Sequence, residues 1–131
     1  GSSAASDVYK RQDLTLIANI VYMVNVQNTQ TLILTLPASP QTGDVVRMID
    51  VGGNLKYDTT LVLRTPETSG TPIQGDSTGT LFGDRLTPYP SGELVVQTPN
   101  AGFALIYLGA TDSNDQIGIP TSVQGWWLME V

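Results

Sequence analysis

The 131-residue sequence contains neither cysteine nor histidine. Without cysteine there is no disulfide, no thiolate nucleophile and no cysteine-ligated metal. Without histidine, the chain lacks the side chain that most often acts as a general acid or base near neutral pH. Ser-His-Asp and Cys-His catalysis are therefore excluded. The two absences predict a protein without enzymatic activity, with no cofactor, no catalytic residue and no metal site.

Basic residues and long apolar runs are also scarce. Six Lys and Arg stand against twelve Asp and Glu, which gives a formal charge of −6. Nucleic-acid binding normally rests on a basic patch, so no nucleic-acid partner is predicted. No apolar run approaches the ~20 residues of a membrane helix, and no signal peptide is recognisable at the start. We therefore predict no membrane insertion.

Turn-forming residues and strand-like alternation are what the sequence does contain. Thirteen Gly and eight Pro are spread along the chain, which favours strands and turns over helices. Apolar residues alternate within 32–36 and 46–48, and the intervening 37–44 (PASPQTGD) has turn chemistry. This stretch predicts a strand, a tight loop and a second strand, with Gly43 free to take a positive φ.

Other runs have the length and composition of strands. They cover residues 14–27, as one long or two short strands, and 60–64, 93–97, 103–108 and 125–131. Residues 14–64 are predicted to form a meander. Because 103–108 is apolar on both faces, its strand is expected to be covered on both sides, by a sandwich core or a symmetric oligomer. Residues 13–131 are therefore predicted to form a single all-β module, a compact antiparallel β-sandwich or barrel-like fold.

Adjacent tryptophans near the end of the sequence point to a contact surface. Trp126 and Trp127 face opposite sides of a strand, so one can enter the core and the other must be exposed or covered by a partner. Tryptophan is enriched at interfaces. We therefore hypothesise a subunit interface, built from one or both tryptophans together with Phe103, Leu105 and Tyr107.

Two long irregular segments, 65–92 and 109–124, are candidate functional loops, since such segments are uncommon in compact domains. The predicted surface binding residues are Phe82, Asp84, Arg85, Tyr89 and Tyr57. Aromatic platforms beside carboxylates would suit a carbohydrate-binding or receptor-binding module. A carboxylate-dependent glycan hydrolase is the weakest alternative, because it needs two loop acids to converge. Residues 112–115 (DSND) offer oxygen ligands for calcium, but an Asx-type turn is the preferred interpretation.

The first twelve residues, GSSAASDVYKRQ, have no apolar periodicity. Gly1-Ser2 resembles a cloning scar. Residues 6–12 resemble a translated transposon-end adapter of the kind left at the ends of metagenomic contigs. Residues 1–12 are therefore expected to be foreign to the module, and 13–131 to be the C-terminal part of a longer protein. The alternative is an ordinary flexible arm.

Several strings together resemble a known family. They are TLILTLPASPQTGDVVRMIDVGGN from Thr31, a strand ending at Arg64, IQG at 73–75, FALIYLGAT from Phe103 and the final GWWLMEV. This pattern resembles a β-module of tailed-bacteriophage virion proteins, found in tail fibres and in trimeric baseplate wedge pin-like proteins. Residues 65–93 and 112–124 are longer than in the family pattern, so binding specificity is expected there.

The resemblance implies a non-enzymatic viral structural protein located in the virion. It implies a homotrimer, contacts with other virion proteins and a role in assembly, with host-surface glycan as a further partner in attachment. A carbohydrate-binding or receptor-binding module and a capsid decoration protein remain the alternatives.

Overall fold

A computed structural model describes residues 5–9, 13–75, 89–109 and 123–130. Within these residues the chain forms ten strands: β1 (Ala5–Tyr9), β2 (Leu14–Thr15), β3 (Ile20–Val24), β4 (Thr31–Thr35), β5 (Val45–Asp50), β6 (Thr60–Arg64), β7 (Ile73–Gln74), β8 (Glu93–Val96), β9 (Gly102–Leu108) and β10 (Gly125–Glu130). The all-β prediction is confirmed. No helix in the described part of the chain is long and apolar enough to cross a membrane.

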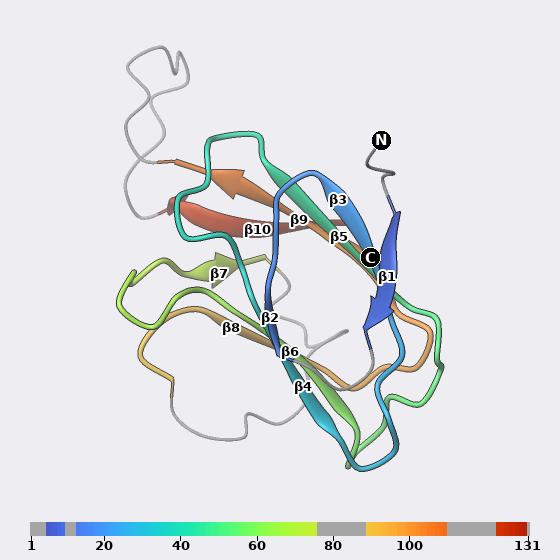
Figure 1. Ribbon diagram of the computed structural model, residues 1–131. Helices are drawn as coiled ribbons and strands as arrows, with labels where there is room; N and C mark the ends of the chain where they lie inside the picture. The colour runs from blue at the N-terminus through green and yellow to red at the C-terminus, as the bar shows by residue number, and fades with distance from the viewer. Residues whose placement is uncertain (1–4, 10–12, 76–88, 110–122, 131) are drawn as a thin grey trace.

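The strands are arranged in two sheets. Among the described residues, one sheet has the order β1-β3-β5-β9-β10-β7 and the other the order β2-β4-β6-β8. Figure 1 shows β4, β6 and β8 grouped apart from β3, β5, β9 and β10. One hydrophobic cluster contains side chains from both sheets, so the arrangement is sandwich-like. Each sheet has two edge strands in these orders, so the barrel-like alternative is wrong.

The predicted antiparallel pairing is wrong for most of the neighbouring strands. The parallel pairs are β1–β3, β3–β5, β2–β4, β4–β6 and β7–β10. The antiparallel pairs are β5–β9, β9–β10 and β6–β8. Both sheets are therefore mixed. Alternation along a strand has the same period in both kinds of ladder, so the sequence pattern does not distinguish them.

The predicted meander over residues 14–64 is also wrong. Consecutive strands from β2 to β6 alternate between the two sheets, so none of them pairs with the next strand along the chain. The connector 37–44 crosses from the four-stranded to the six-stranded sheet instead of closing a hairpin. Residues 14–27 form two strands, β2 and β3, in different sheets. The chain therefore winds around the core.

The core is built from alternate residues of the strands. Leu32 and Leu34 of β4, and Leu36 just after it, are fully buried, and Val46 and Met48 of β5 face them from the other sheet. The prediction that these alternating residues share a buried face is confirmed. Burying a leucine side chain contributes about 1.5–3 kcal/mol, so this row alone is a large part of the apolar stabilisation.

Some strands are buried on both faces. Val62 of β6 and Val95 of β8 are register partners that are buried although they lie outside the core cluster.

A strand also forms within residues 1–12, for which the sequence pattern predicted no structure. Residues Ala5–Tyr9 pair in parallel with β3 at the edge of the six-stranded sheet.

Candidate functional site

Three of the predicted interface residues belong to the core of the chain. Trp126 is 1% exposed, and its ring centroid lies 5.4 Å from that of Tyr107, at an interplanar angle of 60°. Phe103 and Leu105 are also buried in the core cluster. This corrects the interface hypothesis for Trp126, Phe103 and Leu105, because side chains that fill the core do not reach a partner. Tyr107 is partly buried against the same cluster.

Trp127 points to the opposite side of β10. Its register partner Ile106 lies on the same side of the sheet, and its indole nitrogen donates to the carbonyl oxygen of Val123 at 2.7 Å. The indole N–H is thus satisfied within the chain, while the ring stays partly exposed. Trp127 is therefore the one of the two tryptophans that can contact a partner.

Trp127 belongs to a larger apolar surface, which we call the outer apolar face. It includes outward-facing side chains of the six-stranded sheet that are not fully buried: Val21, Met23, Val45, Ile49, Ile106 and Trp127. Ile49 is 41% exposed. Arg47 lies among these residues, and a hollow of about 310 Å³ opens beside it. No outward-facing position of β3, β5 or β9 carries a carboxylate.

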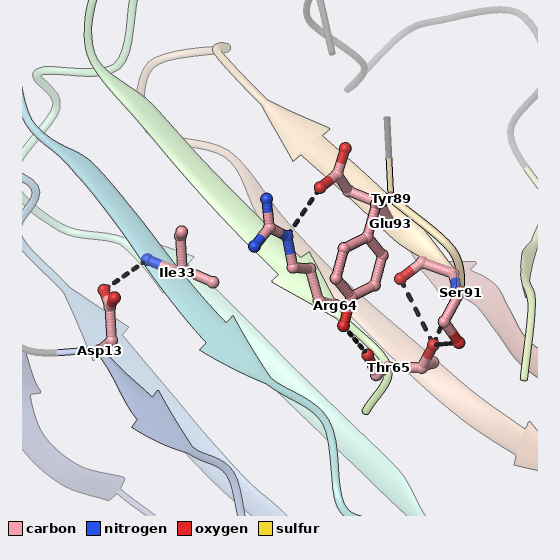
Figure 2. Close-up of polar contacts among 8 residues, drawn as sticks. Asp13, Ile33, Arg64, Thr65, Tyr89, Ser91 and Glu93 are labelled. Atoms are coloured by element: carbon pink, nitrogen blue, oxygen red, sulfur yellow. Dashed lines mark hydrogen bonds and ion pairs between the residues drawn. The ribbon is translucent and has the colours of Figure 1, made fainter. Parts of the chain in front are cut away.

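A second candidate surface lies on the outside of the four-stranded sheet. Arg64, at the end of β6, pairs in register with Glu93, at the start of β8, and the Arg64 Nε to Glu93 Oε2 distance is 2.7 Å. The Glu93 side chain is fully buried and that of Arg64 is 19% exposed. Cζ of Arg64 lies 4.5 Å from the centroid of the Tyr89 ring, a cation–π geometry. Figure 2 shows the three side chains together.

Tyr89 is held at both ends of its side chain. Its hydroxyl donates to the carbonyl oxygen of Thr65 at 2.5 Å, and Arg64 covers its ring. Burial raises the pKa of the Tyr89 phenol above its ordinary value of 10.0. The Arg64 charge lowers this pKa, and the carboxylates of Glu67 and Glu93 raise it. The phenol is therefore neutral at physiological pH, and its one O–H proton is the one donated to Thr65.

The hydroxyl of Thr65 joins both ends of the long 65–92 segment, and we call this arrangement the Thr65 node. Thr65 Oγ1 donates to the carbonyl oxygen of Thr71 at 2.7 Å and accepts from the amide of Gly92 at 2.8 Å. Ser91 Oγ lies 2.5 Å away. Figure 2 shows Ser91 and Thr65 beside Tyr89. The node thus fixes the backbone from which Tyr89 projects.

A hollow of about 560 Å³ opens beside this cluster. It is lined by Gly70, Pro72, Ile73, Tyr89, Pro90, Ser91, Gly92 and Glu93. Of the two predicted binding residues that the structure describes, Tyr89 lines this hollow and Tyr57 does not. Tyr57 is 85% exposed in the turn before β6, at the far end of that strand from Arg64. Phe82, Asp84 and Arg85 lie outside the described residues.

The D-x-x-G-N string, residues 50–54, proves to be structural. The buried carboxylate of Asp50 accepts from the amide of Gly53 at 3.2 Å and from the amide of Asn100 at 2.9 Å. Asn54 Nδ2 donates to the carbonyl oxygen of Val26 at 3.1 Å. The D-x-x-G-N string therefore fixes a turn between β5 and β6, and it provides no reactive group.

The I-x-G and G-W strings lie side by side at one sheet edge. Trp126 of β10 is the register partner of Ile73 of β7, and the Trp126 amide donates to the carbonyl oxygen of Pro72 at 3.0 Å. A Cβ added at Gly125 would lie 2.4 Å from that oxygen. Glycine is therefore required where the two segments meet.

Acidic residues form no recognisable site in the described part of the chain. No group of three or more Asp or Glu side chains described by the structure is placed to hold a metal ion. Residues 112–115, together with Asp76 and Asp84, lie outside the described residues. Comparison of the sequence with protein-family models and with curated proteins finds no match.

Proposed function

We propose that this chain is a non-enzymatic structural module of a phage-like virion, in a tail fibre or baseplate-like assembly. Its sheets form a β-sandwich, and three copies associate through the outer apolar face. The resemblance of the D-x-x-G-N, I-x-G and G-W strings to phage virion modules supports the particle type. The outer apolar face is the observation that carries the assembly role.

Energetics favours covering this face. Monomeric soluble proteins rarely expose large contiguous apolar patches, and such patches commonly mark interaction sites. Removing apolar surface from water contributes about 25 cal/mol per Å². Ile49, Ile106 and Trp127 are not fully buried and lie on the same sheet surface, so burying them together stabilises an assembly.

Charge makes a second copy of the chain a suitable partner. The net charge of −6 repels identical chains. The outward-facing positions of β3, β5 and β9 have no carboxylate, whereas β10 carries Glu130 in register with Ala104. A contact centred on β3, β5 and β9 therefore brings no acids of these three strands together. The hollow beside Arg47 offers room for a partner side chain.

Light scattering coupled to size-exclusion chromatography tests this proposal. We expect the full chain at micromolar concentration to have three times its 14.0 kDa mass. Ile49→Lys places a charge on the outer apolar face and should shift the protein to monomer. Tyr57→Lys, at an 85% exposed position near the other sheet, is the matched control and should leave the mass unchanged.

A strict monomer for the unmodified chain at micromolar concentration would contradict the assembly role, and so would an Ile49→Lys variant that stays trimeric. Affinity capture from phage particles then separates the two virion roles. A fibre or baseplate module should retain tail components, whereas a decoration protein would retain capsid.

A further inference from the structure

We propose that the hollow beside Tyr89 binds an uncharged sugar ring, with Tyr89 as its stacking platform. This inference goes beyond the assembly role and concerns a different sheet. Aromatic rings bind sugars by packing against the apolar C–H face of the ring, while nearby polar groups bond its hydroxyls. The Tyr89 hollow provides both kinds of contact.

The platform is fixed before any ligand arrives. The Arg64 guanidinium covers one side of the Tyr89 ring, and the phenolic hydroxyl is bonded to Thr65. Arg64 itself does not line the hollow. Figure 2 shows Arg64 and Ser91 beside Tyr89, and of these two only Ser91 lines the hollow. We infer that the hollow meets the ring face that Arg64 leaves open. Ordering a side chain on binding weakens the affinity, and here the fold has already ordered it.

The lining of the hollow is amphipathic, as a sugar ring is. Pro72, Ile73 and Pro90 provide apolar walls, and Ser91 contributes a hydroxyl. Ser91 is held in place by contacts of its Oγ with Thr65 and, at 3.1 Å, with Ser69. The volume of about 560 Å³ falls within the 300–1,000 Å³ range of small-molecule sites. A mono- or disaccharide is therefore of suitable size.

Charge selects an uncharged sugar over an acidic one. Among the residues that the structure describes, Glu93 lines the hollow and no lysine or arginine does. The Arg64 charge is already paired with Glu93. A carboxylate on the sugar would be repelled by the Glu93 carboxylate. A carboxylate-bearing sugar is therefore disfavoured relative to its neutral counterpart.

Saturation-transfer NMR on the full chain tests the site directly. The probes are the methyl glycosides of glucose, galactose and mannose. Methyl glucuronide serves as the acidic counterpart of methyl glucoside. We expect at least one neutral glycoside to bind with a millimolar dissociation constant and to receive saturation mainly on one ring face. Methyl glucuronide should bind several-fold more weakly than methyl glucoside.

Variants distinguish the platform from nonspecific binding. Tyr89→Ala should weaken binding about tenfold or more, which corresponds to 1.4 kcal/mol. Tyr89→Phe keeps the ring, so its dissociation constant should stay within about threefold of that of the unmodified chain. Tyr57→Ala, at the exposed tyrosine outside the hollow, is the matched control and should have no effect. Amide chemical shifts of Ser91 and Gly92 should move on titration, and circular dichroism checks that each variant is folded.

Several results would overturn the sugar site. The first is that no neutral glycoside receives saturation from the protein. The second is that Tyr89→Ala binds as tightly as the unmodified chain, or that Tyr57→Ala and Tyr89→Ala lose the same affinity. The third is that methyl glucuronide binds more tightly than methyl glucoside. If Tyr89→Ala does not fold, Tyr89→Phe is compared with Tyr89→Leu, since only the former keeps the aromatic face. Equal sugar affinities for these two variants would then overturn the site. None of these results depends on oligomeric state, so this inference and the assembly role fail separately.

Discussion

At the scale of single residues, Asp50 shows how a charged side chain becomes part of the core boundary. It follows Val46 and Met48 in the inward-facing row of β5 and is 2% exposed. Its two carboxylate oxygens accept from the amides of Gly53 and Asn100. Buried carboxylates are tolerated when their oxygens are hydrogen-bonded, so Asp50 joins two loops that are far apart in sequence.

We predict that Asp50→Ala lowers the free energy of unfolding by about 2–4 kcal/mol, because it leaves two main-chain donors without their acceptor. Asp50→Asn keeps one acceptor oxygen, so it should lower the free energy of unfolding by less than Asp50→Ala does. Urea denaturation followed by tryptophan fluorescence measures both. The exposed acid Glu67 provides the control, since Glu67→Ala should stay within about 0.5 kcal/mol of the unmodified protein. An Asp50→Ala variant as stable as that control would show that the turn does not depend on this carboxylate.

At the scale of elements, the β7–β10 edge shows why family-like strings can be far apart and still form one feature. Ile73 and Trp126 are register partners, and Gly125 has a φ of +131°. This backbone conformation is unfavourable for residues with a side chain, and the Pro72 carbonyl also occupies the space that a Cβ would need.

We therefore expect Gly125→Ala to lower the free energy of unfolding by about 2 kcal/mol or more, through backbone strain and overpacking. Thermal unfolding by circular dichroism measures the loss, and fluorescence of the buried Trp126 reports whether β10 has moved. Gly102→Ala is the matched control, because a Cβ there meets no atom within 4 Å. Equal unfolding midpoints for the two variants would contradict the steric argument.

Strand positions could be predicted from the sequence, but strand partners could not. Alternation located β4 and β5 and identified their buried faces, because a period of two depends only on which side is apolar. Alternation did not reveal that β4 pairs in parallel with β6. The same alternating pattern would also fit an antiparallel hairpin of β4 and β5. The connector 37–44 has turn residues in either case. What it joins depends on the packing of the whole core.

The candidate site was predictable only in part for the same reason. Tyr89 was identified as an aromatic in a long loop. Its contacts with Arg64 and Thr65 were not, because they depend on β6 and β8 being neighbours. One usable signal was present. Arg64 ends a strand and Glu93 begins one, as expected for opposite charges facing each other across an antiparallel pair.

At the scale of the whole molecule, the winding of the chain between sheets is the dominant feature. Leu14 pairs with Leu34, and Leu34 with Leu63, so successive neighbours in the four-stranded sheet are separated by an excursion into the other sheet. Each such contact requires the closure of a long loop before it contributes any stability.

Refolding should accordingly be slow for a chain of this size, in the millisecond-to-second range of proteins dominated by non-local pairing. Stopped-flow dilution from urea, followed by tryptophan fluorescence, measures the rate. A second denaturation step of varied length separates this phase from proline isomerisation, which takes tens of seconds. A main refolding phase in microseconds would contradict the expectation.

The Thr65 node has a consequence for protein engineering. Because one hydroxyl holds Thr71, Ser91 and Gly92 together, the chain leaves the four-stranded sheet and returns to it almost at the same point. Lengthening a loop whose ends are already clamped costs little, about 0.6 kcal/mol for each doubling. The part of this segment between β7 and Tyr89 is thus a natural position for displaying a foreign peptide on this scaffold.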